Sequence, residues 1–413
     1  MIYLFTLLIL ASNPLTLDDC ISIAKKNNIK IIQAKKSVEI AKNDVTSSYS
    51  ARYPDINFSS GYSRDYKTNT STTDNHSASI GLSYQLYKGG YISANIEIAK
   101  IRAEIAKDNY LMTEQEVILS VKQTFFNVLQ CEEKVKLCNS ILSRRKEDYL
   151  LIKLKYNTGR ESFPAVEESE VNVANAEYDK LSTEENLKLF RVTLNILIGR
   201  SSQEELVLKQ DTLNPENVKI PSLEEFLSTA KEHRPDMQIE NLNHKILYLQ
   251  LKESKSNYFP KLNLTSSYGL SGSGFFSGDD ISGLKDNPLG IGVNLSFPIF
   301  DGFSTKSQVK GGSLEIAQHI IKLTETEQTI EKEVLQAYSQ WILAKKKVEI
   351  SRKSLKASQD MYTLTRFEYE QGLTTYFFYQ QKESDLTGAQ YDYISSLNNL
   401  QITIANLYKA GGL

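Results

Sequence analysis

The chain contains little cysteine, histidine and tryptophan. Only 3 Cys, 4 His and 1 Trp occur among its 413 residues. The cysteines, Cys20, Cys131 and Cys138, are odd in number and include no Cys-x-x-Cys pair, so the sequence predicts neither a disulfide framework nor a zinc knuckle. The histidines show no spacing typical of a metal site, and no nucleophile, base and orienting group can be assembled. We therefore predict a protein that is not an enzyme and that carries no cofactor or metal.

The chain also lacks a surplus of either charge and lacks long apolar runs. It holds 48 Lys and Arg against 50 Asp and Glu, a net charge of −2, which does not favour binding to nucleic acid. Apart from the first ten residues, no run approaches the roughly 18 to 20 apolar residues of a membrane-spanning helix. Helical spans are thus excluded, but a transmembrane β-barrel is not, because its strands alternate apolar with polar residues.

The N-terminus resembles a signal peptide. A compact apolar stretch from Ile2 to Leu10 is followed by small and turn-forming residues. No Lys or Arg precedes it, which departs from the usual pattern. We predict that residues 1–12 are a signal peptide and that the protein is exported.

The second half of the chain repeats the first. Leu17-Asp18-Asp19 recurs as Leu223-Glu224-Glu225, and Gly199 recurs as Gly412. The spacing between matching residues grows between these points, most simply in the Ser/Gly-rich stretch SGSGFFSGDDISG of the second half. The predicted boundaries are 15–200 for the first repeat, 201–220 for a linker and 221–413 for the second repeat.

Each repeat is predicted to begin with a helix and to continue with two strands. Apolar residues such as Ile56, Phe58 and Tyr62 alternate with small uncharged ones. The expected strands, at about 55–66, 77–87, 261–272 and 290–300, have roughly the 9 to 11 residues needed to cross a bilayer. A soluble sandwich with one wet face is the alternative, but the small polar face suits a narrow lumen better.

Very long helices follow the strands. Apolar or aromatic residues recur every seven positions, at Val121, Val128, Val135, Leu142, Tyr149 and Tyr156, and again at Val334, Trp341, Val348, Leu355, Tyr362 and Tyr369. A strict seven-residue period predicts left-handed supercoiling with neighbouring helices. Long helical hairpins are expected at about 90–198 and 303–410. Four strands cannot close a barrel in lipid, but three chains together would supply twelve.

The chain resembles the TolC-type outer-membrane efflux proteins, from Leu15 to Leu413. The resemblance rests on the order and duplication of several short motifs. These are LxLxxxIxxAxxxN from Leu15, the aromatic-Pro pairs before the strands, LSxxLxxGG, LSFPIFDG, the YxxG turns, and Leu197-Ile198-Gly199. It implies a homotrimer with a 12-stranded β-barrel in the outer membrane and a helical barrel in the periplasm. The tips would meet a periplasmic adaptor of an inner-membrane transporter, forming a passive duct for efflux or type I secretion.

The resemblance also places a gate at the tips of the helical hairpins. The candidate gate or adaptor-docking residues are Tyr156, Asn157, Thr158, Gly159, Arg160 and Glu161 in the first hairpin, and Tyr369, Glu370, Gln371, Gly372, Leu373 and Thr374 in the second. We expect Tyr156 and Tyr369 to pack the tips closed. Relatives often carry aspartates just beyond the second tip, where this chain has Phe378 and Gln381. Glu167, Glu168 and Glu170 could supply charge there or could form a solvated face.

Two other kinds of protein fit parts of the pattern. A periplasmic coiled-coil adaptor or structural protein would share the helices, and its strands would form an ordinary small domain. A porin without partners would explain the strands but would have no use for such long helices.

Overall fold

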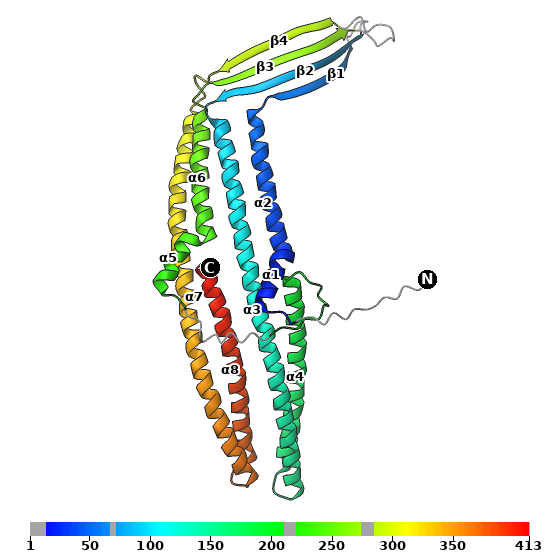
Figure 1. Cartoon of the computed structure of the whole chain (residues 1–413), viewed down its shortest axis with the longest axis vertical. Helices are drawn as coiled ribbons and strands as arrows, with labels where there is room; N and C mark the ends of the chain where they lie inside the picture. Colours follow the sequence, from blue (N-terminus) through cyan, green and yellow to red (C-terminus); the bar gives the residue numbers. More distant parts are fainter. Residues whose placement is uncertain (1–13, 67–71, 210–219, 274–284, 413) are drawn as a thin grey trace, which may run out of the picture. The chain divides into compact units, whose positions relative to one another are not determined.

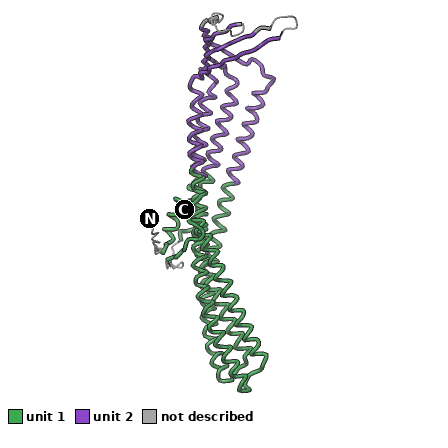
Figure 2. Tube along the Cα trace, turned by 90° about the vertical axis from the view of Figure 1, so that its right-hand side faces the viewer, with its two compact units in different colours: residues 1–35, 110–237, 326–413 green, residues 36–109, 238–325 purple. Residues whose placement is uncertain are grey.

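A computed structural model describes residues 14–66, 72–209, 220–273 and 285–412 (Figure 1). The predicted signal peptide and most of the Ser/Gly-rich stretch lie outside these residues. The chain divides into two compact units (Figure 2). Unit 1 holds residues 1–35, 110–237 and 326–413, and unit 2 holds residues 36–109 and 238–325. Each unit takes segments from both repeats, so the compact units differ from the repeats expected as domains.

The first repeat runs through helices and strands in the order expected from the sequence. Its elements are α1 (Leu17–Asn27), α2 (Ile29–Ser48), the 3-10 helix η1 (Tyr49–Arg52), β1 (Asp55–Tyr66), β2 (Thr72–Lys88), α3 (Tyr91–Asn157) and α4 (Phe163–Leu197). The second repeat has the same order without a 3-10 helix among its described residues. Its elements are α5 (Leu223–His233), α6 (Pro235–Ser256), β3 (Lys261–Ser273), β4 (Lys285–Ser296), α7 (Ser304–Glu370) and α8 (Tyr376–Ala410).

The two repeats match in helix length and in the way their helices begin. Helices α3 and α7 each have 67 residues, and α4 and α8 each have 35. Helices α1 and α5 both start with a capping box, formed by Thr16 with Asp19 and by Ser222 with Glu225. In each box the hydroxyl accepts from a backbone N–H of the first turn, while the carboxylate accepts from the N–H of the capping residue. The same local chemistry thus sets the same start in both halves.

The four strands form one antiparallel sheet in unit 2, in the order β1-β2-β3-β4. The pairing of β2 with β3 joins the two repeats. Apolar residues meet across the strands: Ile80 of β2 lies opposite Phe58 of β1 on one side and opposite Tyr268 of β3 on the other. The β1 and β4 edges have no partner strand among the described residues.

The strand ends differ from those expected. Strand β2 begins at Thr72 rather than at 77, and β4 covers Lys285–Ser296 rather than 290–300. The earlier end of β4 has a local cause: Pro298 has no N–H to donate, and it also restricts the backbone of Phe297 before it. Phe297 and Ile299, expected to continue the apolar face of the strand, therefore lie beyond it.

Unit 1 holds four apolar clusters among its described residues, each built from two or more helices, the fourth of them between α7 and α8 around Val348 and Leu400. One joins α1 to the middle of α3 and the end of α4, and it includes the buried residues Cys20, Val121 and Leu194. A second joins α5 to α7 and α8 around Phe226. The third lies at the turns of the two helical hairpins and is rich in tyrosine. All three cysteines are free and buried.

None of the helices in the described part of the chain is long and apolar enough to cross a membrane.

Candidate functional site at the helical tips

Two similar turns connect the long helices, one between α3 and α4 and one between α7 and α8. Gly159 and Gly372 have φ angles of 73° and 77°, which favour glycine. The N–H of Arg160 donates to the carbonyl of Lys155, and the N–H of Leu373 donates to the carbonyl of Glu368, each at 2.8 Å. These bonds cap the last turn of each helix in a Schellman arrangement. The glycines are thus explained by the turn itself.

Of the twelve tip residues, Tyr369 is the one that is buried, with 2% of its surface exposed. Its hydroxyl donates to Glu161 Oε2 of the other hairpin at 2.9 Å. The Lys155 ammonium donates to the backbone carbonyl of Tyr369 and lies 3.7 Å from the centre of its ring. Burial raises the pKa of Tyr369 and lowers that of Lys155. Tyr369 therefore links the two tips.

Tyr156, the matching residue of the first hairpin, is placed differently. It is 41% exposed, and its ring centre lies 5.9 Å from that of Phe163 in its own hairpin. The two tyrosines expected to act as a pair therefore have different surroundings. The remaining tip residues are half-buried or exposed: Asn157, Thr158, Gly159, Arg160, Glu161, Glu370, Gln371, Gly372, Leu373 and Thr374.

A cluster of four tyrosines lies behind the tips. The rings of Tyr369 and Tyr379 are stacked, with centres 5.1 Å apart and an angle of 4° between them. Tyr362 and Tyr376 lie next to these two rings. All four side chains are buried, and burial raises the pKa of Tyr376 to about 12. Aromatic side chains with polar ends thus replace the aliphatic residues of an ordinary helical seam.

Next to the tyrosines, a buried carboxyl group joins α3 to α8. The Tyr379 hydroxyl donates to Asp148 Oδ1 at 2.7 Å, and both side chains are buried. Asp148 forms no ion pair with any described residue. Burial raises the pKa of Asp148 to about 6, although the hydrogen bond from Tyr379 acts in the opposite direction.

One turn further along α8, Glu383 pairs with two arginines of α3. Arg144 Nη2 lies 3.0 Å from Glu383 Oε1, and Arg145 Nη2 lies 2.7 Å from Glu383 Oε2. The glutamate side chain is 4% exposed, so this is a buried ion pair in which both carboxylate oxygens are used. We call Arg144, Arg145, Asp148, Tyr379 and Glu383 the clamp, because together they connect the two hairpins.

Phe378 and Gln381, just beyond the second tip, are uncharged and exposed in this chain. Phe378 is 42% exposed, and Gln381 donates to Asp385 at 2.9 Å. Glu167, Glu168 and Glu170 are all exposed. Their exposure is consistent with a solvated face.

Two of the four histidines meet in unit 2, which their spacing did not indicate. The rings of His244 and His319 are stacked with centres 5.5 Å apart, and His319 Nε2 lies 3.1 Å from Glu240 Oε2. Within the described residues, no group of three or more His, Cys, Asp or Glu side chains is placed to hold a metal ion.

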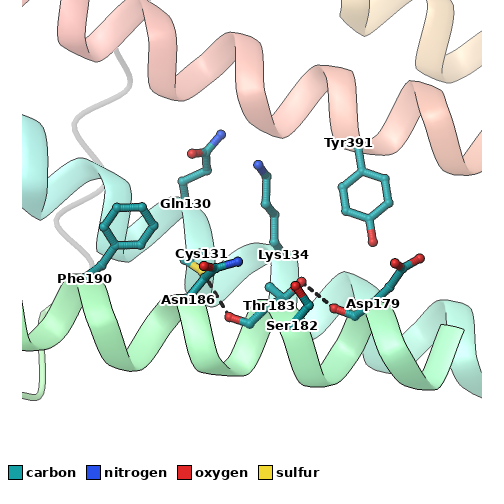
Figure 3. A pocket seen from close by; sticks show the side chains of 9 residues that line it. All are labelled: Gln130, Cys131, Lys134, Asp179, Ser182, Thr183, Asn186, Phe190 and Tyr391. Carbon is teal, nitrogen blue, oxygen red and sulfur yellow. Dashed lines mark hydrogen bonds between the residues drawn. The ribbon is translucent and has the colours of Figure 1, made fainter. Parts of the chain in front are cut away.

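A polar groove of about 470 Å³ opens further along unit 1, between α3, α4 and α8 (Figure 3). Gln130 and Lys134 of α3 point towards α8, where Tyr391 faces them (Figure 3). At its floor the Cys131 thiol donates to the carbonyl of Thr183. The groove follows the junction between the two hairpins.

The clamp residues were not among the candidates predicted from the sequence, although one signal was present. Cys131, Cys138, Arg145 and Ile152 are seven residues apart, and the cysteines and Ile152 are buried. An arginine within a buried seven-residue row requires a partner across the seam. Nothing local in the sequence identifies Glu383 as that partner, because the two residues belong to different repeats.

The fold and the paired hairpins define a class of protein. A model of the outer membrane efflux protein family matches residues 20–200 and 226–413, so the chain belongs to that family. The predicted fold class is confirmed, and this is the fold of trimeric channels that combine a β-barrel with a helical barrel. The chain is therefore an outer-membrane channel of efflux systems that extends into the periplasm, and it is not an enzyme.

Individual relatives are distant in sequence but similar over nearly the whole chain. The outer membrane protein TolC of Vibrio cholerae is 22% identical over 399 residues, covering 93% of this chain and 89% of its own. A probable outer membrane lipoprotein, SilC of Salmonella typhimurium, is 23% identical, covering 94% and 84%. The crystal structure of CusC matches with a TM-score of 0.82 at 19% identity, covering 96% of this chain and 92% of that one.

Proposed function

We propose that three copies of this chain form a passive export duct that works with a periplasmic adaptor and an inner-membrane transporter. The observation that carries the proposal is the four-stranded sheet, which has one apolar face and two edges, β1 and β4, without a partner strand among the described residues. Unpaired edges are not tolerated in lipid, so β1 of one copy is expected to pair with β4 of the next. Three copies would close a barrel of about twelve strands.

The helices of unit 1 support the same assembly. Apolar side chains that are seven residues apart remain exposed on α4 and α7, as at Val171 and Tyr178 and at Leu343 and Ile350. Most polar contacts between the hairpins instead join α3 to α8. We infer that α4 of one copy packs against α7 of the next, which would bury these rows.

The gate is proposed at the tips, where Tyr369 and the clamp hold the two hairpins of one copy together. Opening requires the hairpins to separate, so these contacts must break. The exposed tip residues, including Arg160 and Leu373, are the surface proposed to bind the adaptor.

Three measurements test the proposal on the full-length protein. Mass determination in detergent should find three chains per particle, and reconstitution in planar bilayers should give discrete channel conductance. A monodisperse soluble monomer obtained without detergent would refute the barrel. For partners, co-purification with an adaptor encoded beside this gene should depend on the tips and should be weakened by Leu373→Asp.

A further inference from the structure

The contact between Asp148 and Tyr379 differs chemically from the ion pair beside it. Glu383 is held by two guanidinium groups, whereas Asp148 has only the Tyr379 hydroxyl as a close partner among the described residues. A phenol can donate to a carboxylate or to the carbonyl oxygen of a neutral carboxyl group. The contact can therefore persist when Asp148 takes up a proton.

We propose that Asp148 is a proton sensor within the clamp: acid holds the two hairpins together, and neutral pH favours their separation. The inference rests on the proposed gating function and adds a form of regulation to it. It places the sensor in α3, behind the tip, at a residue that does not belong to the predicted tip set.

The groups around Asp148 come from all four long helices of unit 1. Helix α3 contributes Arg144 and Arg145, and α7 contributes Arg366 and Tyr369. Helix α8 contributes Tyr376, Tyr379 and Glu383, and α4 lines the small cavity beside Asp148 with the neutral Ser169 and Asn172. The arginines favour an ionised Asp148, whereas Glu383 and burial oppose it, and burial has the largest effect.

The direction of the response follows from linkage. The pKa of Asp148 is about 6 in the closed arrangement, and a carboxyl group released into water returns to about 3.9. The closed state therefore binds the proton more tightly. Its extra stability is fully present below about pH 4 and is lost as the pH rises through about 6. When the pH falls from 7 to 5, the ratio of the closed to the open population should rise about tenfold per subunit.

The test is single-channel recording of the full-length trimer at pH 7 and pH 5. We expect the open probability of the wild type to fall on acidification. Asp148→Asn keeps an acceptor for Tyr379 but cannot ionise, so it should be mostly closed at both pH values. Asp385→Asn, which removes an exposed carboxylate on α8, is the matched control and should keep the wild-type response. A pH response in Asp148→Asn equal to that of the wild type would overturn the proposal.

Hydrogen exchange of the wild type gives a readout that needs neither conductance nor a variant. After correction for intrinsic exchange rates, amides at 376–387 should become about tenfold better protected between pH 7 and pH 5. Unchanged or reduced protection would overturn the sensor. If no form of the protein conducts, the proposed gated export duct fails, while the exchange result still decides whether acid closes the clamp.

Discussion

Replacing Glu383 by glutamine should loosen the contact between the two hairpins. The change keeps the shape of the side chain and one acceptor oxygen, but it removes the negative charge between Arg144 and Arg145. Two guanidinium groups would then remain largely buried without an anion. The closed state should lose stability, and the channel should open more often.

The size of the effect follows from burial. Removing one partner of a buried ion pair costs about 3 to 5 kcal/mol, and an acceptor that remains reduces this, so we expect about 2 to 3 kcal/mol. Every 1.4 kcal/mol is a factor of ten, so the ratio of open to closed should rise about 30- to 150-fold per subunit. Glu177→Gln is the matched control: it breaks an ion pair with Lys146 that is also 2.7 Å long but is exposed and within one hairpin. It should cost at most about 0.5 kcal/mol.

The assay is single-channel recording at neutral pH, with both variants and the wild type in the same lipid. Open probabilities give the free-energy difference directly. Equal open probabilities for Glu383→Gln and Glu177→Gln would refute the reasoning, because they would show that the buried ion pair does not hold the gate.

Two further predictions concern stability and reactivity. Gly372→Ala places a side chain at a φ of 77° and should destabilise the protein by about 1 kcal/mol. Gly388→Ala lies within α8, where nothing is within 4 Å of the added atom, and should stabilise the protein by up to about 1 kcal/mol. Thermal unfolding compares the two variants, and equal effects on stability would contradict the prediction. Burial raises the pKa of Cys20 to about 11. At about pH 8 a thiol reagent should therefore label Cys20 slowly in the folded protein and rapidly after denaturation. Rapid labelling of Cys20 in the native protein would contradict its buried position.

The architecture could be predicted because it depends on patterns that repeat. The seven-residue rows predicted the long helices, and the alternation of Ile56 and Phe58 with small residues predicted the strands. The duplication predicted that both halves have the same order of elements. The ends of the strands were harder to predict from the sequence, because the length of β2 depends on its pairing with β1 and β3. The signal peptide lies outside the described residues and stays a prediction.

The clamp was missed because its two groups of residues, one on α3 and one on α8, belong to different repeats and are polar. Seven-residue periodicity identifies apolar seams, so it found Tyr369 but not Asp148 or Glu383. A purely apolar seam would be costly to separate, because each Å² of apolar surface exposed to water costs about 25 cal/mol. Tyrosines, a carboxyl group and an ion pair can instead exchange their partners for water when the hairpins part. The polar residues that sequence patterns treat as interruptions are therefore the ones suited to a seam that has to open and close.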